Sequence, residues 1–93
     1  MKLFKSVDDK FRDIGFVKET DNEYCVCYVR KNPKYNFTQC LDILHKSNGQ
    51  HIAQSYDRGL VDINGIGNTC VGLTYYEMKL VLKKIRQKGW KSR

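Results

Sequence analysis

The stretch of sequence that decides the expected fold is residues 73–90, LTYYEMKLVLKKIRQKGW. Thr74 is followed three residues later by Glu77. This pair is a capping box, in which each side chain binds a backbone N–H group that the first helical turn leaves free. A helix is therefore predicted to begin at Thr74. We expect it to end at Gly89, because glycine readily takes the left-handed conformation that follows many helices.

The predicted helix is amphipathic. At about 100° per residue, its apolar side chains fall within about 120° of arc and are expected to be buried: Tyr75, Met78, Val81, Leu82 and Ile85. The opposite arc is basic and carries Lys79, Lys83, Lys84, Arg86 and Lys88. Tyr76 and Leu80 lie four residues apart in the middle of this basic arc, so we expect an exposed apolar pair framed by lysines.

A second amphipathic helix is predicted over residues 2–14. Its apolar arc holds Leu3, Phe4, Val7, Phe11 and Ile14. Gly15 followed by Phe16 ends this helix with the glycine-then-aromatic pattern that recurs at Gly89 and Trp90. Two terminal helices with one apolar stripe each need a common surface to cover.

The middle of the chain supplies that surface as strands separated by turns. The predicted strands are residues 16–19, 23–31, 35–46 and 50–57, and Asn48-Gly49 is the strongest hairpin signal. Residues 58–72 are rich in glycine and asparagine and read as a long loop with room for a short edge strand. The sequence thus predicts an α+β two-layer sandwich: an antiparallel meander of three to four strands, with the N- and C-terminal helices packed on one face. We treat residues 1–93 as a single domain.

The two tight turns predict which side chains face the helices. A two-residue loop at Asn48-Gly49 pairs Leu41 with Tyr56, and a three-residue loop at residues 32–34 sets Val29 opposite Phe37. The outer face then holds Tyr24, Val26, Tyr28, Thr38, Cys40, Asp42, Leu44, His51, Ala53 and Ser55. This set is apolar for a solvated face. Either the register differs by one residue, which would swap the faces, or the surface meets a partner.

The net charge of +7 is concentrated at one end of the chain. Residues 1–78 hold ten Lys and Arg against ten Asp and Glu, so all seven surplus charges fall in residues 79–93. Such a patch attracts nucleic acid, acidic proteins and anionic lipid alike. No apolar run approaches the roughly 20 residues that span a bilayer, and residues 1–16 lack the apolar core of a signal peptide. We expect a cytoplasmic protein without a membrane partner.

Four cysteines, Cys25, Cys27, Cys40 and Cys70, are many for a small cytoplasmic protein. Structural zinc sites bring their ligands in closely spaced pairs, whereas Cys40 and Cys70 have no close partner in sequence. We therefore expect the thiols to pack as small apolar groups, without a metal or other cofactor. Cys27 and His45 could share a sheet face, but neither lies in a catalytic motif, so we expect no enzyme.

Several motifs together resemble a group of known proteins. They are IGF at residues 14–16, HKSNG at 45–49 followed by HIAQSYD, and VGLTYYEMK with the closing KGW at 88–90. This combination resembles small uncharacterised proteins encoded by phages, prophages and mobile elements of Gram-positive bacteria, over most of the chain. Because the motifs are turns and helix ends, the resemblance implies a fold and a genomic setting. It also implies a phage-like protein that binds host machinery, including defence systems.

Two functions follow as hypotheses. The first is a non-catalytic binding protein that contacts a protein partner or a second copy of itself, with these candidate residues: Tyr24, Tyr28, Tyr76, Lys79, Leu80, Lys83 and Lys84. The alternative is a nucleic-acid-binding accessory protein that uses the basic C-terminal helix, through Lys83, Lys84, Arg86, Lys88 and Lys91. The sequence holds no helix-turn-helix, zinc-finger or aromatic RNA-binding signature.

Overall fold

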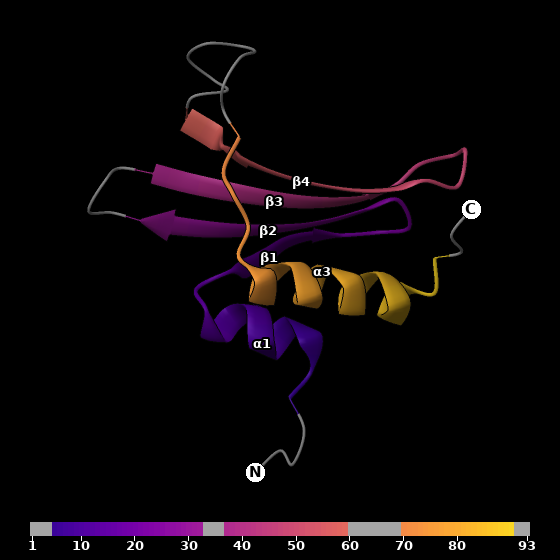
Figure 1. The fold of residues 1–93 in the computed structure, drawn as a ribbon, viewed down its shortest axis with the longest axis horizontal. Coiled ribbons are helices and arrows are strands. Elements are labelled where there is room, and N and C mark those ends of the chain that lie inside the picture. The colour runs from indigo at the N-terminus through magenta and orange to yellow at the C-terminus, as the bar shows by residue number, and fades with distance from the viewer. Residues whose placement is uncertain (1–4, 33–36, 60–69, 91–93) are drawn as a thin grey trace.

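The structure, a computed structural model, describes residues 5–32, 37–59 and 70–90. Within these ranges the elements follow in the order α1 (Val7–Asp13), β1 (Val17–Asp21), β2 (Cys25–Asn32), β3 (Phe37–His45), β4 (His51–Asp57) and α3 (Tyr75–Lys88). The strands form one antiparallel sheet in the order β1-β2-β3-β4. Figure 1 shows α3 and α1 on the same side of this sheet. The predicted α+β meander with two helices is confirmed.

Both helices begin with a capping box. In α3, the Thr74 hydroxyl accepts the Glu77 N–H at 3.1 Å, and a Glu77 carboxylate oxygen accepts the Thr74 N–H at 2.8 Å. Gly89 ends α3 at φ +71°, so both predicted ends are correct. In α1 the capping residue is Ser6, and the helix starts at Val7. The predicted start at residue 2 is wrong, because Lys5 and Ser6 precede the helix and Ser6 caps it in an extended conformation, while Leu3 and Phe4 lie outside the described residues.

The predicted strand register is wrong. Lys46 donates its N–H to the Gln50 carbonyl at 2.8 Å, so the loop holds three residues, 47–49, with Gly49 at φ +89°. His45 consequently pairs with His51, and every side chain of β4 changes face. Asn32 pairs with Phe37, which shifts β2 against β3 by an odd number of residues and turns β2 over as well.

The swap puts large apolar side chains under the helices. The buried cluster consists of Phe11, Phe16, Val26, Tyr28, Leu41, Ile43, Leu80 and Val81. At its centre the Phe11 ring stacks on Tyr28 with 4.1 Å between centroids, and Phe16 meets Phe11 edge-on at 5.8 Å. Tyr28 and Val26 therefore belong to the core, not to the outer face where the predicted register put them.

Helix α3 is also rotated relative to the prediction. Val81 is buried as expected, but Leu80 is buried too, at 1% exposure, so it is no part of an exposed pair. Tyr75, Met78 and Leu82 are exposed by 73, 47 and 55%, although the pattern predicted them to be buried. The inward arc instead contains Glu77 and Lys84, which are buried against charges on other elements. No helix among the described residues is long and apolar enough to cross a membrane.

Candidate functional site

A cluster of ion pairs lies between the two helices and the edge of the sheet. We call it the ion-pair cluster, and it consists of Asp8, Lys18, Asp21, Lys84 and Lys88. The Lys84 ammonium lies 3.1 Å from a carboxylate oxygen of Asp8, and Lys88 lies 2.7 Å from Asp21. Lys18 reaches both carboxylates, at 2.8 and 2.9 Å. These contacts tie α1, β1 and α3 together.

The cluster changes the acidity of its members. Burial alone would raise the pKa of Asp8, but hydrogen bonds from Lys18, Tyr28 and Lys84 outweigh it and hold the pKa well below its usual range. Burial and the hydrogen bond to Asp8, 2.6 Å long, raise the pKa of the Tyr28 hydroxyl. Asp8 therefore stays a carboxylate at neutral pH and neutralises inward-facing lysines.

This geometry corrects the predicted basic surface. Lys84 was expected to contact a partner or nucleic acid, yet it is 3% exposed and paired with Asp8. Lys88 pairs with Asp21 and lies over the Trp90 ring at 5.7 Å. Lys91, the remaining candidate beyond α3, lies outside the described residues. Of the six cations that the sequence assigned to binding, Lys84 and Lys88 thus form ion pairs within the fold, and Lys91 is not described.

Four cations form a second group, which we call the cationic ridge: the exposed Lys79, Lys83 and Arg86, and the half-buried Lys10. Lys10 of α1 lies beside Lys83, and this contact, with the charges of Lys79 and Arg86, holds the pKa of Lys83 below its ordinary value. No carboxylate pairs with a member of the ridge among residues 5–32, 37–59 and 70–90. The ridge is a locally uncompensated positive surface.

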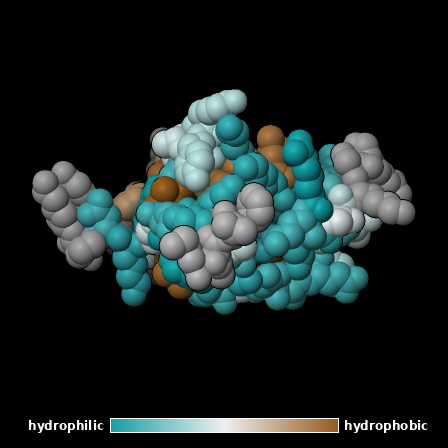
Figure 2. Space-filling model, turned by 90° about the horizontal axis from the view of Figure 1, so that it is seen from below, coloured by the Kyte–Doolittle hydropathy of each residue, from teal (hydrophilic) through white to brown (hydrophobic). Residues whose placement is uncertain are grey.

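Next to the ridge, α3 carries an exposed apolar strip, which we call the apolar flank: Tyr75, Met78 and Leu82. Lys83 lies on the side of α3 that faces α1. Met78 lies on the opposite side of the helix, toward β4. On β4, Ala53 faces the helices and is nevertheless exposed, so α3 leaves this strand uncovered. Figure 2 shows the helix side as mainly hydrophilic, with hydrophobic side chains in separate patches.

The other predicted partner residues do not lie on one surface. Tyr76 is exposed on α3, as expected, but its supposed neighbour Leu80 is in the core. Tyr24 is 61% exposed in the turn before β2, whereas Tyr28 is fully buried. The structure therefore gathers Tyr76, Lys79 and Lys83 on one exposed surface and removes Tyr28, Leu80 and Lys84 from it. The apolar flank is the feature that the sequence pattern missed.

Three cysteines lie on the outer face of the sheet. Val26 and Tyr28 point inward, so Cys25 and Cys27 point outward, and Cys40 joins them on β3. The suggestion that Cys27 and His45 share a sheet face is wrong, because His45 lies on the inner face. Burial and Asp42 raise the pKa of the Cys27 thiol. Among the described residues, no three His, Cys, Asp or Glu side chains are grouped as metal ligands would be.

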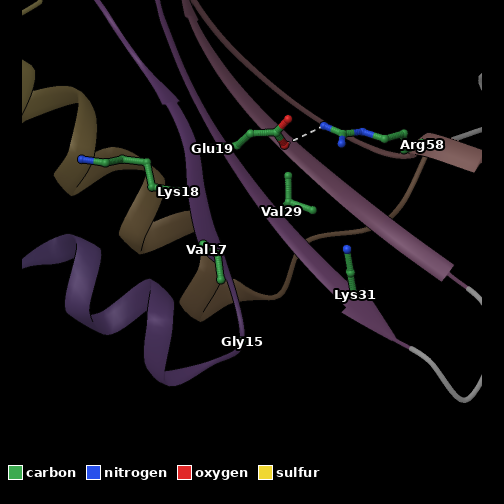
Figure 3. A pocket seen from close by; sticks show the side chains of 7 residues that line it. All are labelled: Gly15, Val17, Lys18, Glu19, Val29, Lys31 and Arg58. Atoms are coloured by element: carbon green, nitrogen blue, oxygen red, sulfur yellow. Dashed lines mark hydrogen bonds and ion pairs between the residues drawn. The ribbon is translucent and has the colours of Figure 1, made fainter.

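An ion pair between residues from opposite edges of the sheet crosses this outer face. Arg58, which follows β4, donates to Glu19 on β1 at 2.8 Å, and in Figure 3 the contact passes over the strands between them. Beside it lies a shallow hollow with an apolar floor of Val17 and Val29. In Figure 3 the Lys18 side chain points away from this hollow, toward the helices. Of the charged residues that line the hollow, Lys31 is the one that forms no ion pair with another described residue.

Aromatic rings pack together on the inner face of the β3–β4 hairpin, next to its loop. The Trp90 ring stacks on His45 with 5.2 Å between centroids and lies 5.8 Å from His51. Nδ1 of His45 and Nε2 of His51 are buried without a hydrogen-bond partner among the described residues. The sequence pattern gave no sign of this contact, because the three-residue loop is what brings the two histidines opposite one another.

No protein-family model, curated protein or solved structure matches this chain. The function is therefore argued from the chain's own surface. Two exposed features on that surface are not used by the fold itself, namely the apolar flank and the cationic ridge, and they adjoin each other on α3.

Proposed function

We propose that this protein is a non-catalytic binding module that contacts a protein partner through the exposed side of α3. The observation that carries the proposal is the apolar flank. Tyr75, Met78 and Leu82 stand at positions i, i+3 and i+7 of one helix and are each about half exposed or more. A single exposed apolar residue is ordinary, whereas this spacing is the one by which a helix inserts into a partner's groove.

The adjoining cationic ridge specifies the chemistry of that partner. Lys79 and Arg86 border the flank, and Lys79 lies over the Tyr75 ring at 5.5 Å. An apolar anchor row with a cationic rim is complementary to an apolar groove with an acidic rim. The proposed partner is therefore an acidic protein surface. From the resemblance to phage and mobile-element proteins, we further propose that it belongs to the machinery of a bacterial host and is met in the cytoplasm.

The test compares capture of proteins from a host lysate by matched variants. Leu82→Ser and Met78→Ser each remove one anchor from the flank, while Tyr24→Ser removes a comparably exposed aromatic residue outside α3, in the turn before β2. A partner that is retained by the wild type and the Tyr24→Ser control, and lost with both flank variants, supports the proposal. A partner retained by all four proteins would place the binding surface elsewhere.

Nucleic-acid binding is the second candidate, and the cationic ridge favours it. Its four cations, three of them exposed, have no carboxylate partner in the described part of the chain, and such a group suits a phosphate backbone. Each phosphate neutralised on duplex DNA contributes a slope of about 0.9 in log affinity against log salt, so Lys79→Gln with Lys83→Gln should reduce the slope by almost two. Tight binding of duplex DNA that hardly changes with salt would exclude this mechanism.

A further inference from the structure

The strand β4 has a backbone edge that the fold only partly uses. The pair Lys46 and Gln50 is hydrogen-bonded, and hydrogen-bonded pairs alternate along an antiparallel ladder. Ile52 and Gln54 therefore direct their backbone groups toward β3, whereas His51, Ala53 and Ser55 direct theirs outward. The Ser55 carbonyl confirms this geometry, since it accepts the Val71 N–H at 2.9 Å on the outer side.

The segment at residues 70–71 pairs only with the far end of β4, through Ser55 and Tyr56. At His51 and Ala53, no described residue pairs with the outward N–H and C=O groups. Natural edge strands are commonly protected by lysine, proline or a bulge. Residues 50–54 contain no lysine or proline, and the pairing of β4 with β3 is regular. As far as the described residues go, this stretch is an edge at which another strand can pair.

We propose that the open edge of β4 pairs with the same edge of a second copy, antiparallel, with the two-fold axis at Ile52. The sequence of the open stretch is Gln-His-Ile-Ala-Gln at residues 50–54. With the axis at Ile52, each His51 faces Ala53 of the other copy, and these are the two residues whose backbone groups point outward. The pairing makes about four hydrogen bonds and places Ile52 opposite itself, as an isologous contact requires.

Charge favours a second copy over a strand from an acidic partner at this edge. The stretch carries no formal charge, although the protein as a whole carries +7. Two copies can meet here without bringing like charges together, and Gln50 faces Gln54 of the other copy. The pairing also stops where the Val71 contact begins, since Ser55 is already bonded. An acidic partner would find its complementary charge on the cationic ridge instead.

The dimer has a consequence for α3. A two-fold axis perpendicular to the sheet leaves both helix layers on the same side, and the exposed Ala53 indicates that α3 does not obstruct the edge. The dimer therefore displays two apolar flanks side by side, which raises the apparent affinity for a partner with two grooves. The inference does not rest on the proposed function, because it uses the backbone of β4 and not the surface of α3.

A disulfide experiment tests the register. In a background of Cys70→Ser, which removes the exposed native thiol, Ile52→Cys places two thiols across the axis at a non-hydrogen-bonded pair, where Cβ atoms are about 4.5–5.5 Å apart. Mild oxidation should give a covalent dimer within minutes. Gln54→Cys is the matched control on the same face of β4, and it should cross-link at least tenfold more slowly, because it faces Gln50 of the other copy. Equal rates for the two variants would overturn the proposed axis.

Sedimentation velocity under reducing conditions tests the association itself, from about 10 µM to about 1 mM, because so small an interface is expected to be weak. The wild type should shift from monomer toward dimer over this range. Ala53→Pro removes an N–H group that points outward, so β4 keeps its bonds to β3, and the dissociation constant should rise at least tenfold. Ile52→Lys, which sets two charges face to face, should have the same effect. A wild type that stays monomeric at about 1 mM, or folded variants that associate as the wild type does, would overturn the proposal.

Discussion

The Lys84 ammonium lies 3.1 Å from the Asp8 carboxylate, although the two residues are 76 positions apart in the chain. Asp8 also accepts hydrogen bonds from Tyr28 and Lys18, so it joins both helices to the sheet. A buried cation is stable only with such a partner, because desolvation of an unpaired charge costs several kcal/mol. This contact therefore ties the inward side of α3 to α1 and, through Asp8, to the sheet.

We expect Lys84→Ala to lower the free energy of unfolding by about 1–3 kcal/mol, because it leaves Asp8 without its buried partner. The adjacent Lys83→Ala should change it by less than about 0.5 kcal/mol, since Lys83 is exposed and crowded by like charges. Urea denaturation of both variants measures the difference. Equal losses would mean that the buried pair does not hold the helix.

Acid should destabilise the protein through the same carboxylates. The pKa values of Asp8 and Asp21 are lowered in the folded state, so their contribution is present above the ordinary carboxyl pKa of about 4 and is lost as the pH falls through the lower folded values. The free energy of unfolding should therefore fall below about pH 4. Asp8→Asn should flatten this dependence, measured by urea denaturation at several pH values. An Asp13→Asn control with the same flattening would assign the effect to general surface charge.

Glu77 has two separable roles. One carboxylate oxygen caps α3 at Thr74, and the other lies 2.9 Å from the Arg30 guanidinium. Glu77→Gln keeps a capping side chain and removes the buried ion pair, so we expect a loss of about 1–3 kcal/mol. Glu77→Ala should cost about 1 kcal/mol more, because the cap is lost as well. Thermal or urea unfolding measures both losses. Equal free energies of unfolding for the two variants would contradict a separate role for the cap.

The thiols should differ in reactivity according to burial. Cys70 is exposed, whereas Cys27 and Cys40 are buried, and burial raises the pKa of both buried thiols. Alkylation of the native protein, followed by mass spectrometry, should label Cys70 first. Cys27 and Cys40 should be labelled at least tenfold more slowly until the protein is unfolded. Fast labelling of Cys40 in the folded protein would show that the outer face opens.

The placement of the cysteines predicts that the purified protein holds no stoichiometric metal. Structural zinc needs four converging ligands, and in the described part of the chain no three His, Cys, Asp or Glu side chains are grouped in this way. The melting temperature should be the same with and without a chelator, because loss of a structural zinc would remove about 10 kcal/mol of folding free energy. Near-stoichiometric zinc by elemental analysis, with a large drop on chelation, would contradict this.

The sequence by itself determined the elements and where they end. The Thr74 and Glu77 capping box and the left-handed Gly89 are local devices, each formed by neighbours within one turn, and they are found where the sequence places them. The strands and their antiparallel order follow from the same kind of local signal. Local signals did not determine which side chains of the sheet face the helices. A hairpin loop of three residues in place of two exchanges the two faces of β4.

Only the tertiary structure decided the rotation of α3. By hydrophobic pattern Tyr75, Met78 and Leu82 belong inside. The helix turns them outward, and its inward arc instead places Leu80 in the core and pairs Lys84 and Glu77 with charges on other elements. Those partners lie on other elements, so no periodicity within the helix reveals them. The candidate binding surface therefore depends on contacts with residues distant in the chain, which the apolar pattern of the helix does not contain.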